Sequence, residues 1–363
     1  MKLSKIISSI RPLNSKAMKK AENHQSQLTK PNKSLGTLES IAIRVSGITG
    51  HEIPSLGKKR IILCAADHGV TVEGVSAYPS TVTPMMVINF LKGGAAINAL
   101  ARQAGAEVQI VDVGVADNLP KHPKLISAKI RFGTRNLKEE PAMTSNECIQ
   151  ALKLGLKLAD QAKKDKVKWV VLGEMGIGNT TSAAALMASL LPCAVKDVTG
   201  FGTGINHAQW MIKCRIISEA LQRHSLNTLK PLQSLQCVGG LEIATLCGIV
   251  LGCAKNRIPL VVDGFITSAA FLVAYRITPK VRDFCFFSHR SEEPGHNKFF
   301  EILETEPLLN FKMRLGEGTG GTLALNILES ALRVHKEMAT FTSAKIPTKI
   351  KNPKTVRKSS TPS

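Results

Sequence analysis

Short runs of apolar and β-branched residues alternate along this chain with longer stretches rich in alanine and leucine. The runs predict strands at Arg60–Ala66, Glu107–Val113, Lys168–Leu172, Ile258–Asp263 and Val281–Phe287. The longer stretches predict helices that include Met85–Gln103, Ser145–Lys163, Thr180–Leu190, His207–Gln222 and Glu242–Ala254. Continuous apolar strands are buried on both faces, and their alternation with helices favours a parallel sheet. The pattern therefore predicts an α/β fold, Rossmann-like, with three layers.

The two ends of the chain differ from this alternating middle. Residues 1–55 have a helical pattern, and a last helix follows the glycine-rich segment near residue 320 and ends near Phe341. We expect residues 1–55 and 301–341 to pack together as a small helical domain beside a large α/β domain formed by residues 56–300. Residues 342–363 are rich in Ser, Thr, Pro and Lys, a composition typical of a basic disordered tail.

Charge and composition exclude several classes of protein. The net charge is +21, and much of it lies at the two ends of the chain. Because no zinc-finger spacing or aromatic RNA-binding motif accompanies it, we expect weak polyanion affinity and no specific nucleic acid partner. The uncharged run from Glu174 to Lys196 contains several glycines and polar residues and predicts a buried helix, not a membrane span. With no signal-peptide pattern at the N-terminus, we expect a cytoplasmic protein.

Neither cysteine nor histidine spacing indicates a metal site. The eight cysteines contain no C-x-x-C pair and lie mostly in apolar surroundings, which favours buried free thiols. His68, His289 and His296 have no partner at i+4 and belong to no cluster with ligand spacing, so hydrogen bonding is the better interpretation. We therefore expect no metal and no cofactor.

Polar and glycine-rich segments follow the predicted strands. They are Asp67–Gly69, Gly173–Thr181, Asp263–Phe265 and Ser288–Ser291. Because ligands of open parallel sheets bind at the carboxyl ends of strands, these segments predict a site at one edge of the sheet.

The segment Arg314–Gly321 places one carboxylate, Glu317, among glycines directly before a predicted helix. Glycine permits close approach of the backbone to a ligand, and a helix start offers free N–H groups. A lone match of this kind fits a helix cap as well as a ligand site. Its position among the strand-end segments favours the ligand site.

Two other glycine clusters have the composition of a phosphate-binding turn. Gly176–Thr181 opens a helix and includes Gly176 and Gly178, and Gly200–Gly204 includes Gly202 and Gly204, ahead of a helix with Lys213. Neither contains a Walker lysine, so they favour a monophosphate over a nucleoside triphosphate. The run Leu260–Thr267 faintly resembles the ribose-diphosphate loop of phosphoribosyltransferases but has the single acid Asp263, a candidate ribose or structural hydrogen bonder.

An ordered set of motifs is more specific than any of these clusters. It comprises Ala65–Val70, Gly74–Pro79, Gly93–Asn98, Gly173–Thr181, Gly239–Ala244, Val262–Phe265, Ser288-His289 and Arg314–Gly320. Over roughly residues 30–341 the chain resembles the nicotinate-nucleotide–dimethylbenzimidazole phosphoribosyltransferases. The resemblance implies transfer of 5-phosphoribosyl from nicotinate mononucleotide to 5,6-dimethylbenzimidazole, giving α-ribazole 5′-phosphate and nicotinate in cobalamin biosynthesis. It also implies a homodimer.

The resemblance further implies roles for single residues. It makes Glu317 the general base and Glu174 a ligand of the ribose hydroxyls. It assigns the phosphate to Gly176, Gly178, Gly202, Gly204 and Lys213, and the base pocket to Ser76, Tyr78 and Leu315. The alternative is a related phosphoribosyltransferase or nucleosidase with another acceptor base or water.

One departure from the family bears on the acceptor. The family commonly has a glutamine in the stretch after Val-Thr, where this chain has Val82-Thr83-Pro84-Met85-Met86. Loss of an amide would loosen hydrogen bonding to the acceptor without removing apolar surface. We therefore expect a broad range of acceptors, including other benzimidazoles and purines.

Overall fold

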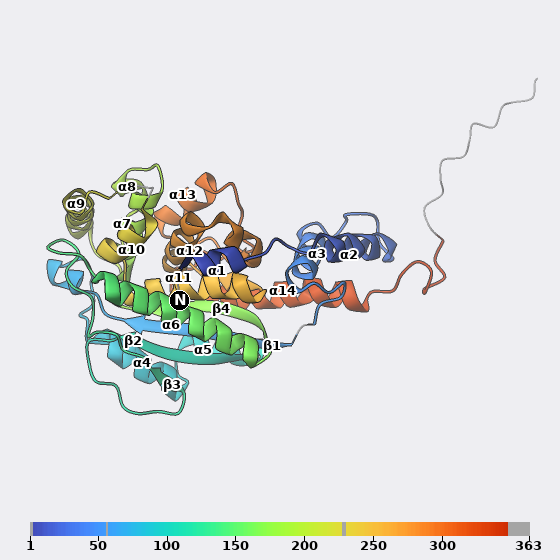
Figure 1. Cartoon of the computed structure of the whole chain (residues 1–363), viewed down its shortest axis with the longest axis horizontal. Helices are drawn as coiled ribbons and strands as arrows, with labels where there is room; N and C mark the ends of the chain where they lie inside the picture. Colours follow the sequence, from blue (N-terminus) through green and yellow to red (C-terminus); the bar gives the residue numbers. More distant parts are fainter. Residues whose placement is uncertain (1–2, 56, 227–229, 348–363) are drawn as a thin grey trace, which may run out of the picture.

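A six-stranded parallel sheet forms the centre of the protein in the computed structural model, which describes residues 3–55, 57–226 and 230–347 (Figure 1). Its strands are β1 (Lys58–Ala66), β2 (Ala106–Gly114), β3 (Leu125–Ser127), β4 (Val167–Met175), β5 (Leu260–Val262) and β6 (Cys285–Phe287). The order is β3-β2-β1-β4-β5-β6, and every neighbouring pair is parallel. This is the doubly wound order, in which the direction of winding reverses between β1 and β4.

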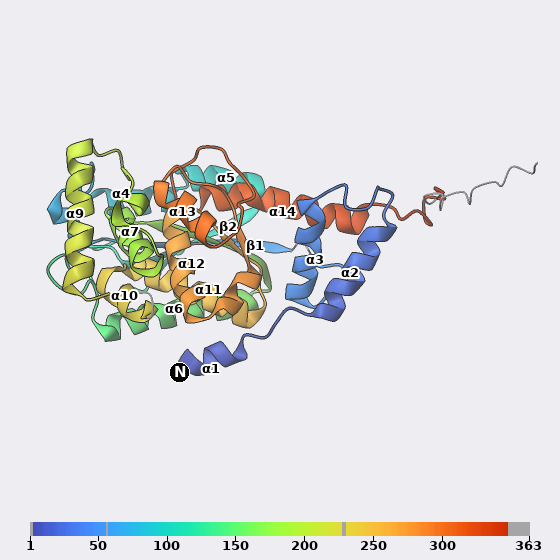
Figure 2. The same cartoon turned by 90° about the horizontal axis from the view of Figure 1, so that it is seen from above.

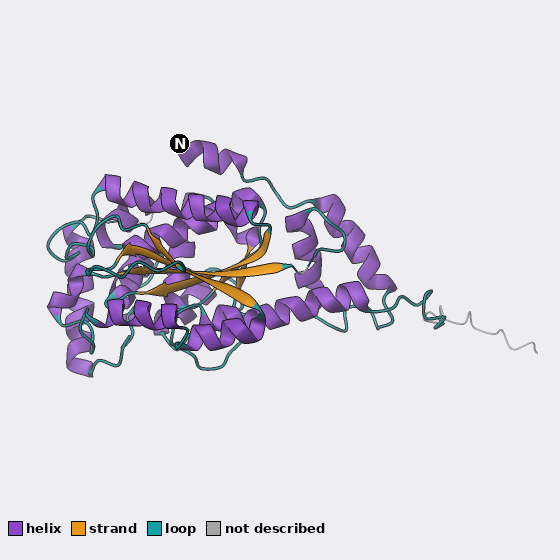
Figure 3. Ribbon diagram, turned by 90° about the horizontal axis from the view of Figure 1, so that it is seen from below, coloured by secondary structure: helices purple, strands orange, loops and turns teal. Residues whose placement is uncertain are grey.

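Helices cover both faces of the sheet, as an edge-on view shows (Figure 3). α6 (Ser145–Lys164) and α11 (Leu241–Asn256) lie on one face, with α12 (Phe265–Ile277) beside α11. α4 (Val82–Lys92), α5 (Ala96–Ala104) and α14 (Thr319–Glu337) lie on the other. Residues 241–254 of α11 are all buried, which explains why this helix has an apolar sequence all round. The predicted α/β class and three layers are confirmed.

Several further helices follow the strands in the chain or lie near their carboxyl ends. They are η1 (Gly69–Glu73), α7 (Asn179–Leu190), α8 (Val195–Val198), α9 (His207–Arg223), α10 (Pro231–Val238) and α13 (Pro294–Ile302). The 3-10 turn η2 (Pro279–Phe284) lies instead at the amino end of β6 and contacts α3, α11 and α12. Figure 2 shows α7, α9 and α10 gathered at one end of the molecule. All eight cysteines are free thiols, six of them buried, as predicted.

The two ends of the chain contact each other at the opposite end of the molecule. α2 (Ser15–Gln27) and α3 (Thr37–Thr49) lie beside the last turns of α14, whereas α1 (Leu3–Ser9) packs on α11 (Figure 2). The Gln25 amide nitrogen lies 2.9 Å from Nδ1 of His335, and Leu28 forms a β-bridge with Thr340. That these segments form a domain of their own stays a prediction.

Several predicted elements differ from the observed ones. The single helix predicted over Met85–Gln103 is two helices, because Gly93 adopts a left-handed φ of 79° and ends α4. Only the second half of Val281–Phe287 is a strand, since its first half belongs to the 3-10 turn η2. The last helix ends at Glu337, and β3 was not predicted because it has only two apolar residues, Leu125 and Ile126, between polar ones.

The predicted basic tail is only partly described. Residues 341–345 form a turn closed by a hydrogen bond from the Ile346 N–H to the Phe341 carbonyl. Residues 348–363 lie outside the described residues. Among the helices of the described chain, none combines the length and apolar character that crossing a membrane requires.

Candidate active site

A cavity of about 440 Å³ opens at the carboxyl ends of β1, β4, β5 and β6. Six of the eleven predicted site residues line it: Tyr78, Glu174, Gly176, Gly202, Leu315 and Glu317. Apolar side chains form much of the remaining wall, including Val82, Met86, Met175, Ile177, Phe265 and Ile266. A doubly wound sheet is expected to bind its ligand where the winding reverses, and β1 and β4 flank this cavity.

Glu174 lies at the end of β4 with its carboxylate almost fully buried. One oxygen accepts a hydrogen bond from the Asn179 side-chain amide at 2.5 Å, and the other accepts from the Glu317 backbone N–H at 3.4 Å. Burial raises the pKa of Glu174 to about 8, with a further contribution from the nearby charges of Asp263 and Glu242. At neutral pH this side chain is therefore mostly protonated and can donate as well as accept a hydrogen bond.

Glu317 occupies a strained turn between Gly316 and Gly318. Its φ is 62°, in the left-handed region that non-glycine residues rarely adopt. The side chain is buried, and among the described residues its Oε2 atom has no hydrogen-bond partner. Burial raises the pKa of Glu317 most, and the negative charge of Asp263 adds to this, while the backbone N–H of Ile97 at the start of α5 lowers it. A partnerless buried carboxylate oxygen in a cavity is suited to accept a proton.

Asp263 follows β5 and holds the turn that carries Glu317. Its carboxylate accepts hydrogen bonds from the backbone N–H groups of Gly318 at 3.2 Å and Gly321 at 2.7 Å. The carboxylate thus satisfies free N–H groups at the start of α14 and complements the helix dipole. Asp263 is buried and does not line the cavity. In the structure Asp263 is therefore a structural hydrogen bonder, which is one of its two predicted roles. The other role, contact with ribose, stays a prediction.

Glycines let these groups approach one another. A Cβ atom on Gly316 would lie 2.3 Å from Oε1 of Glu174, and one on Gly320 would lie 2.0 Å from Nδ1 of His289. Both distances are shorter than atomic contact permits. The glycine-rich sequence around Glu317 is thus a packing requirement of the site as well as a conformational one.

Lys213 lies at the other end of the cavity, behind its wall. The side chain is fully buried, and its Nζ donates to Oγ1 of Thr180 at 2.9 Å and to the Gly200 carbonyl at 3.3 Å. Burial lowers the pKa of Lys213 to about 8. Thr180 belongs to the first turn of α7, so the ammonium, the threonine hydroxyl and a helix start lie together. This combination is typical of an anion site.

Three other predicted residues, Ser76, Gly178 and Gly204, differ in how they are placed relative to the cavity. Ser76 does not line the cavity, but its Oγ lies 3.1 Å from Oγ1 of Thr203, which does. Gly178 is the residue before α7, with a φ of 94°. Gly204 does not line the cavity, and a Cβ atom there would meet nothing within 4 Å. Five of the predicted residues, Ser76, Gly178, Gly204, Lys213 and Asp263, therefore do not line the cavity.

Glu293 is the residue of this region that the sequence did not reveal. It precedes α13, lines the cavity and is only 7% exposed. Its Oε2 atom has no hydrogen-bond partner in the part of the chain that the structure describes. The signal in the sequence was slight: Glu293 follows the polar segment Ser288–Ser291 by two residues and directly precedes a proline, as residues before helices often do.

The three histidines have the hydrogen-bonding role that we predicted. His68 contacts Oγ of Ser182 at 2.9 Å and Oε1 of Glu242 at 2.8 Å. His289 lies 2.9 Å from Oγ of Ser288, and His296 lies 3.0 Å from Oγ of Ser268. Within the described ranges, no group of three or more His, Cys, Asp or Glu side chains is arranged to hold a metal ion.

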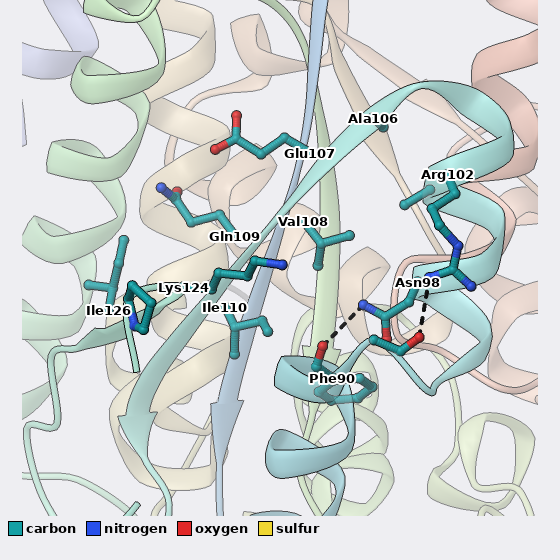
Figure 4. Close-up of a pocket in the computed structure, with 13 residues that line it drawn as sticks. Phe90, Asn98, Arg102, Ala106, Glu107, Val108, Gln109, Ile110, Lys124 and Ile126 are labelled. Atoms are coloured by element: carbon teal, nitrogen blue, oxygen red, sulfur yellow. Dashed lines mark hydrogen bonds between the residues drawn. The ribbon is translucent and has the colours of Figure 1, made fainter. Parts of the chain in front are cut away.

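A second cavity, of about 480 Å³, lies beside the amino-terminal half of β2 and contains none of the predicted residues (Figure 4). Its polar side chains stabilise neighbouring turns. The Asn98 amide donates to the Phe90 carbonyl at 3.1 Å, and Arg102 donates to the Gly93 carbonyl at 3.2 Å (Figure 4). Because these groups are used within the fold and the strand ends lie elsewhere, the first cavity is the better candidate.

Comparison with known proteins first defines a class. A family model described as Phosphoribosyltransferase matches residues 10–346, which is most of the chain. The strand-end cavity, which has Lys213 and the start of α7 beside it and the buried carboxylate of Glu317 in its lining, agrees with that class.

Comparison with individual proteins narrows the class to one family. The nicotinate-nucleotide–dimethylbenzimidazole phosphoribosyltransferase of Chloroflexus aggregans is 48% identical over 342 residues, which cover 94% of this chain and 97% of the relative. The Halalkalibacterium halodurans enzyme of the same name is 48% identical over 343 residues, covering 94% and 96%. A crystal structure of the Thermus thermophilus enzyme matches with a TM-score of 0.87 and 42% identity, over 93% of this chain and all of that one. The chain belongs to the nicotinate-nucleotide–dimethylbenzimidazole phosphoribosyltransferase family.

Proposed function

We propose that this enzyme transfers 5-phosphoribosyl from nicotinate mononucleotide to 5,6-dimethylbenzimidazole, giving α-ribazole 5′-phosphate and nicotinate for the lower ligand of cobalamin. Membership of the family at 48% identity over nearly the whole chain supports the reaction. Within the chain, the observation that supports it best is the buried, partnerless Oε2 of Glu317 in the strand-end cavity.

The proposed reaction needs one proton acceptor. One ring nitrogen of the acceptor attacks C1′ of the ribose while the bond from C1′ to nicotinate breaks and its electron pair stays on the pyridine nitrogen. The second ring nitrogen of the acceptor loses its proton to Glu317. The departing pyridinium becomes neutral, so its release requires no acid. Inversion at C1′ follows when the two bases lie on opposite faces of the sugar.

The two ends of the cavity suggest where the phosphate, the ribose and the acceptor bind. We place the phosphate at the Lys213 end, against Thr180, Gly176 and Gly202, where an ammonium and a helix start favour an anion. Glu174, between the two ends, then meets the ribose hydroxyls, and its mostly protonated carboxyl can donate to one of them. The acceptor stacks against the apolar wall near Tyr78 and Leu315.

Replacement of Glu317 by Gln tests the base. Glu317→Gln removes the proton acceptor but keeps the size of the side chain, so we expect kcat to fall by about 10²–10⁴ with little change in substrate binding. The matched control is Glu337→Gln, at the exposed far end of α14, the helix that follows Glu317, and this change should leave kcat unchanged. An unchanged kcat in Glu317→Gln would contradict the assignment. Release of nicotinate from nicotinate mononucleotide without any acceptor would favour a nucleosidase instead.

The acceptor range is proposed to be broad. In the segment Val82–Met86, where the family commonly has a glutamine after Val-Thr, Val82 and Met86 line the cavity, whereas Met85 is 65% exposed. A wall without an amide selects acceptors by apolar area and stacking, which discriminate weakly between planar bases. In competition between dimethylbenzimidazole and adenine we expect a preference below about a thousandfold, roughly 4 kcal/mol. A larger preference would contradict a broad range.

The enzyme is further proposed to be a cytoplasmic homodimer whose two chain ends form a small domain. Tyr78, Phe201 and Leu315 are each about half exposed around the cavity, and apolar surface at such a position is typical of an interface. Light scattering after gel filtration should give twice the 39.1 kDa of one chain. A mass of one chain would contradict the dimer.

A further inference from the structure

Glu293 places a second carboxylate at the end of the cavity that we assign to the phosphate. The acid lines the cavity together with Thr180, Gly202 and Thr203. It also lies directly against the glycine loop, because a Cβ atom on Gly200 would be only 1.9 Å from Oε2 of Glu293. A buried acid in an anion site opposes the ligand, and none of the steps described above uses it.

The surroundings of Glu293 are those that a bound anion would need. The backbone N–H of Gly202 and the charges of Lys213 and Arg314 all favour its ionised form, although burial outweighs them and raises the pKa of Glu293. Arg314 donates to the Gly202 carbonyl at 3.2 Å, so it contacts the glycine loop against which Glu293 lies. In the described part of the chain, the Lys213 ammonium donates to Thr180 and Gly200, and the Oε2 atom of Glu293 has no hydrogen-bond partner. The carboxylate therefore shares the loop and the cation that we assign to the phosphate without neutralising the cation by direct contact.

We propose that Glu293 is an internal anion that competes with the phosphate of the substrate and takes up a proton from solvent when that phosphate binds. This inference rests on the proposed position of the phosphate. In the empty site the carboxylate balances the buried charge of Lys213. When a phosphate enters, two anions cannot share one buried cation, so the carboxylate gains a proton and its O–H donates to a phosphate oxygen. Departure of the phosphate returns the proton to solvent.

Sulfate is the probe of choice, because it is fully ionised between pH 5.5 and 7.5 and any pH dependence of its binding comes from the protein. For the natural chain we expect the Kd for sulfate to rise with pH, approaching tenfold per pH unit above the pKa of the carboxyl group. Glu293→Gln, which has a neutral side chain of the same size, should bind sulfate at least tenfold more tightly at pH 7.5 and show a flatter pH profile. The matched control, Glu292→Gln, alters the exposed neighbouring acid and should behave like the natural chain.

A third variant separates this inference from the position of the phosphate. Lys213→Met should weaken sulfate binding at every pH if the anion binds where we place it. If Lys213→Met has no effect, the assigned position of the phosphate is wrong. If Lys213→Met weakens binding but Glu293→Gln binds sulfate no more tightly than the natural chain at pH 7.5, or keeps the full pH slope, the competition is wrong and the position stands.

A measurement on the natural chain covers the case in which Glu293→Gln does not fold. Titration calorimetry of sulfate binding at pH 7 in buffers of different ionisation enthalpy gives the number of protons taken up. With a pKa of about 8, Lys213 accounts for only about a tenth of a proton at this pH. Uptake well above that amount is expected, and uptake of no more than a tenth of a proton would overturn the proposal.

Discussion

At the Glu317 end of the cavity, backbone N–H groups and the Asn179 amide hold the buried carboxylates, whereas at the Lys213 end a single ammonium lies among hydroxyl and carbonyl groups. Hydrogen bonds from neutral donors orient a carboxylate but oppose the effect of burial only in part, so the pKa of both Glu174 and Glu317 is raised. Burial of Lys213 lowers its pKa instead. Burial thus makes the carboxylates at one end stronger bases and makes the Lys213 ammonium at the other end a stronger acid.

We expect the largest loss of kcat from a substitution of Gly316, because this glycine allows Glu174 and the turn with Glu317 to lie close together. Gly316→Ala would place Cβ 2.3 Å from Oε1 of Glu174, at a φ of 82°. Either Glu174 or the turn with Glu317 must move, and a displacement of about 1 Å in such a site can cost 10²-fold in kcat. Steady-state kinetics at saturating substrates would measure this loss.

Gly74→Ala is the matched control for Gly316→Ala. Gly74 has a similar φ of 72°, but a Cβ atom there would meet nothing within 4 Å. It shares the backbone strain without the collision, so it should lower the melting temperature and keep kcat. Equal losses of kcat in the two variants would mean that the close packing around Glu174 has no special part in catalysis.

The dependence of activity on pH separates the two ends. Activity should fall as the pH falls through the raised pKa of Glu317, because the protonated acid cannot accept a proton. The value of kcat/KM for nicotinate mononucleotide should also fall as the pH rises past about 8, because Lys213 then loses its charge and Glu174 loses the proton that it donates to a ribose hydroxyl. A bell-shaped profile of kcat/KM is therefore expected.

Measuring kcat at saturating nicotinate mononucleotide tests which end of the cavity causes the fall of activity at low pH and which causes the fall at high pH. Once bound, the phosphate keeps Lys213 charged, so kcat should retain the fall at low pH and lose most of the fall above pH 8. A profile of kcat/KM that stays level from pH 8 to 9.5 would contradict a role for Lys213 in binding the phosphate.

The two ends also differ in how far the sequence could predict them. Glu317 was predictable because glycines surround it, and close backbone approach requires glycine in the local sequence. β4 was predictable from its continuous apolar run. Glu293 was not, because its importance depends on Gly200 and Lys213, which lie far away in the sequence and meet it only in the folded chain. The break at Gly93 was missed because the apolar pattern of α4 resumes in α5 directly after it.

Substitution of Ser76 is expected to have the smallest effect on the kinetics. It tests whether this residue contributes to binding of the phosphate or of the acceptor. Its hydroxyl lies 3.1 Å from Oγ1 of Thr203, which also accepts a hydrogen bond from the Ala77 N–H at 2.9 Å. Ser76→Ala removes the hydrogen bond to Thr203 at a half-buried position, worth about 0.5–1.5 kcal/mol, together with the one that the Ser76 hydroxyl accepts from the Tyr78 N–H at 3.2 Å. Because Thr203 belongs to the glycine loop at the phosphate end, we expect KM for nicotinate mononucleotide to rise roughly 2- to 12-fold.

The matched control for Ser76→Ala is Ser80→Ala, which should leave both KM values unchanged. The resemblance to the family assigns Ser76 to the base pocket, whereas its contact with Thr203 connects it to the phosphate loop. A rise confined to KM for dimethylbenzimidazole would therefore place Ser76 on the acceptor side. In that case the hydrogen bond between Ser76 and Thr203 would join the two ends, because Ser76 would contribute to binding of the acceptor and Thr203 to binding of the phosphate.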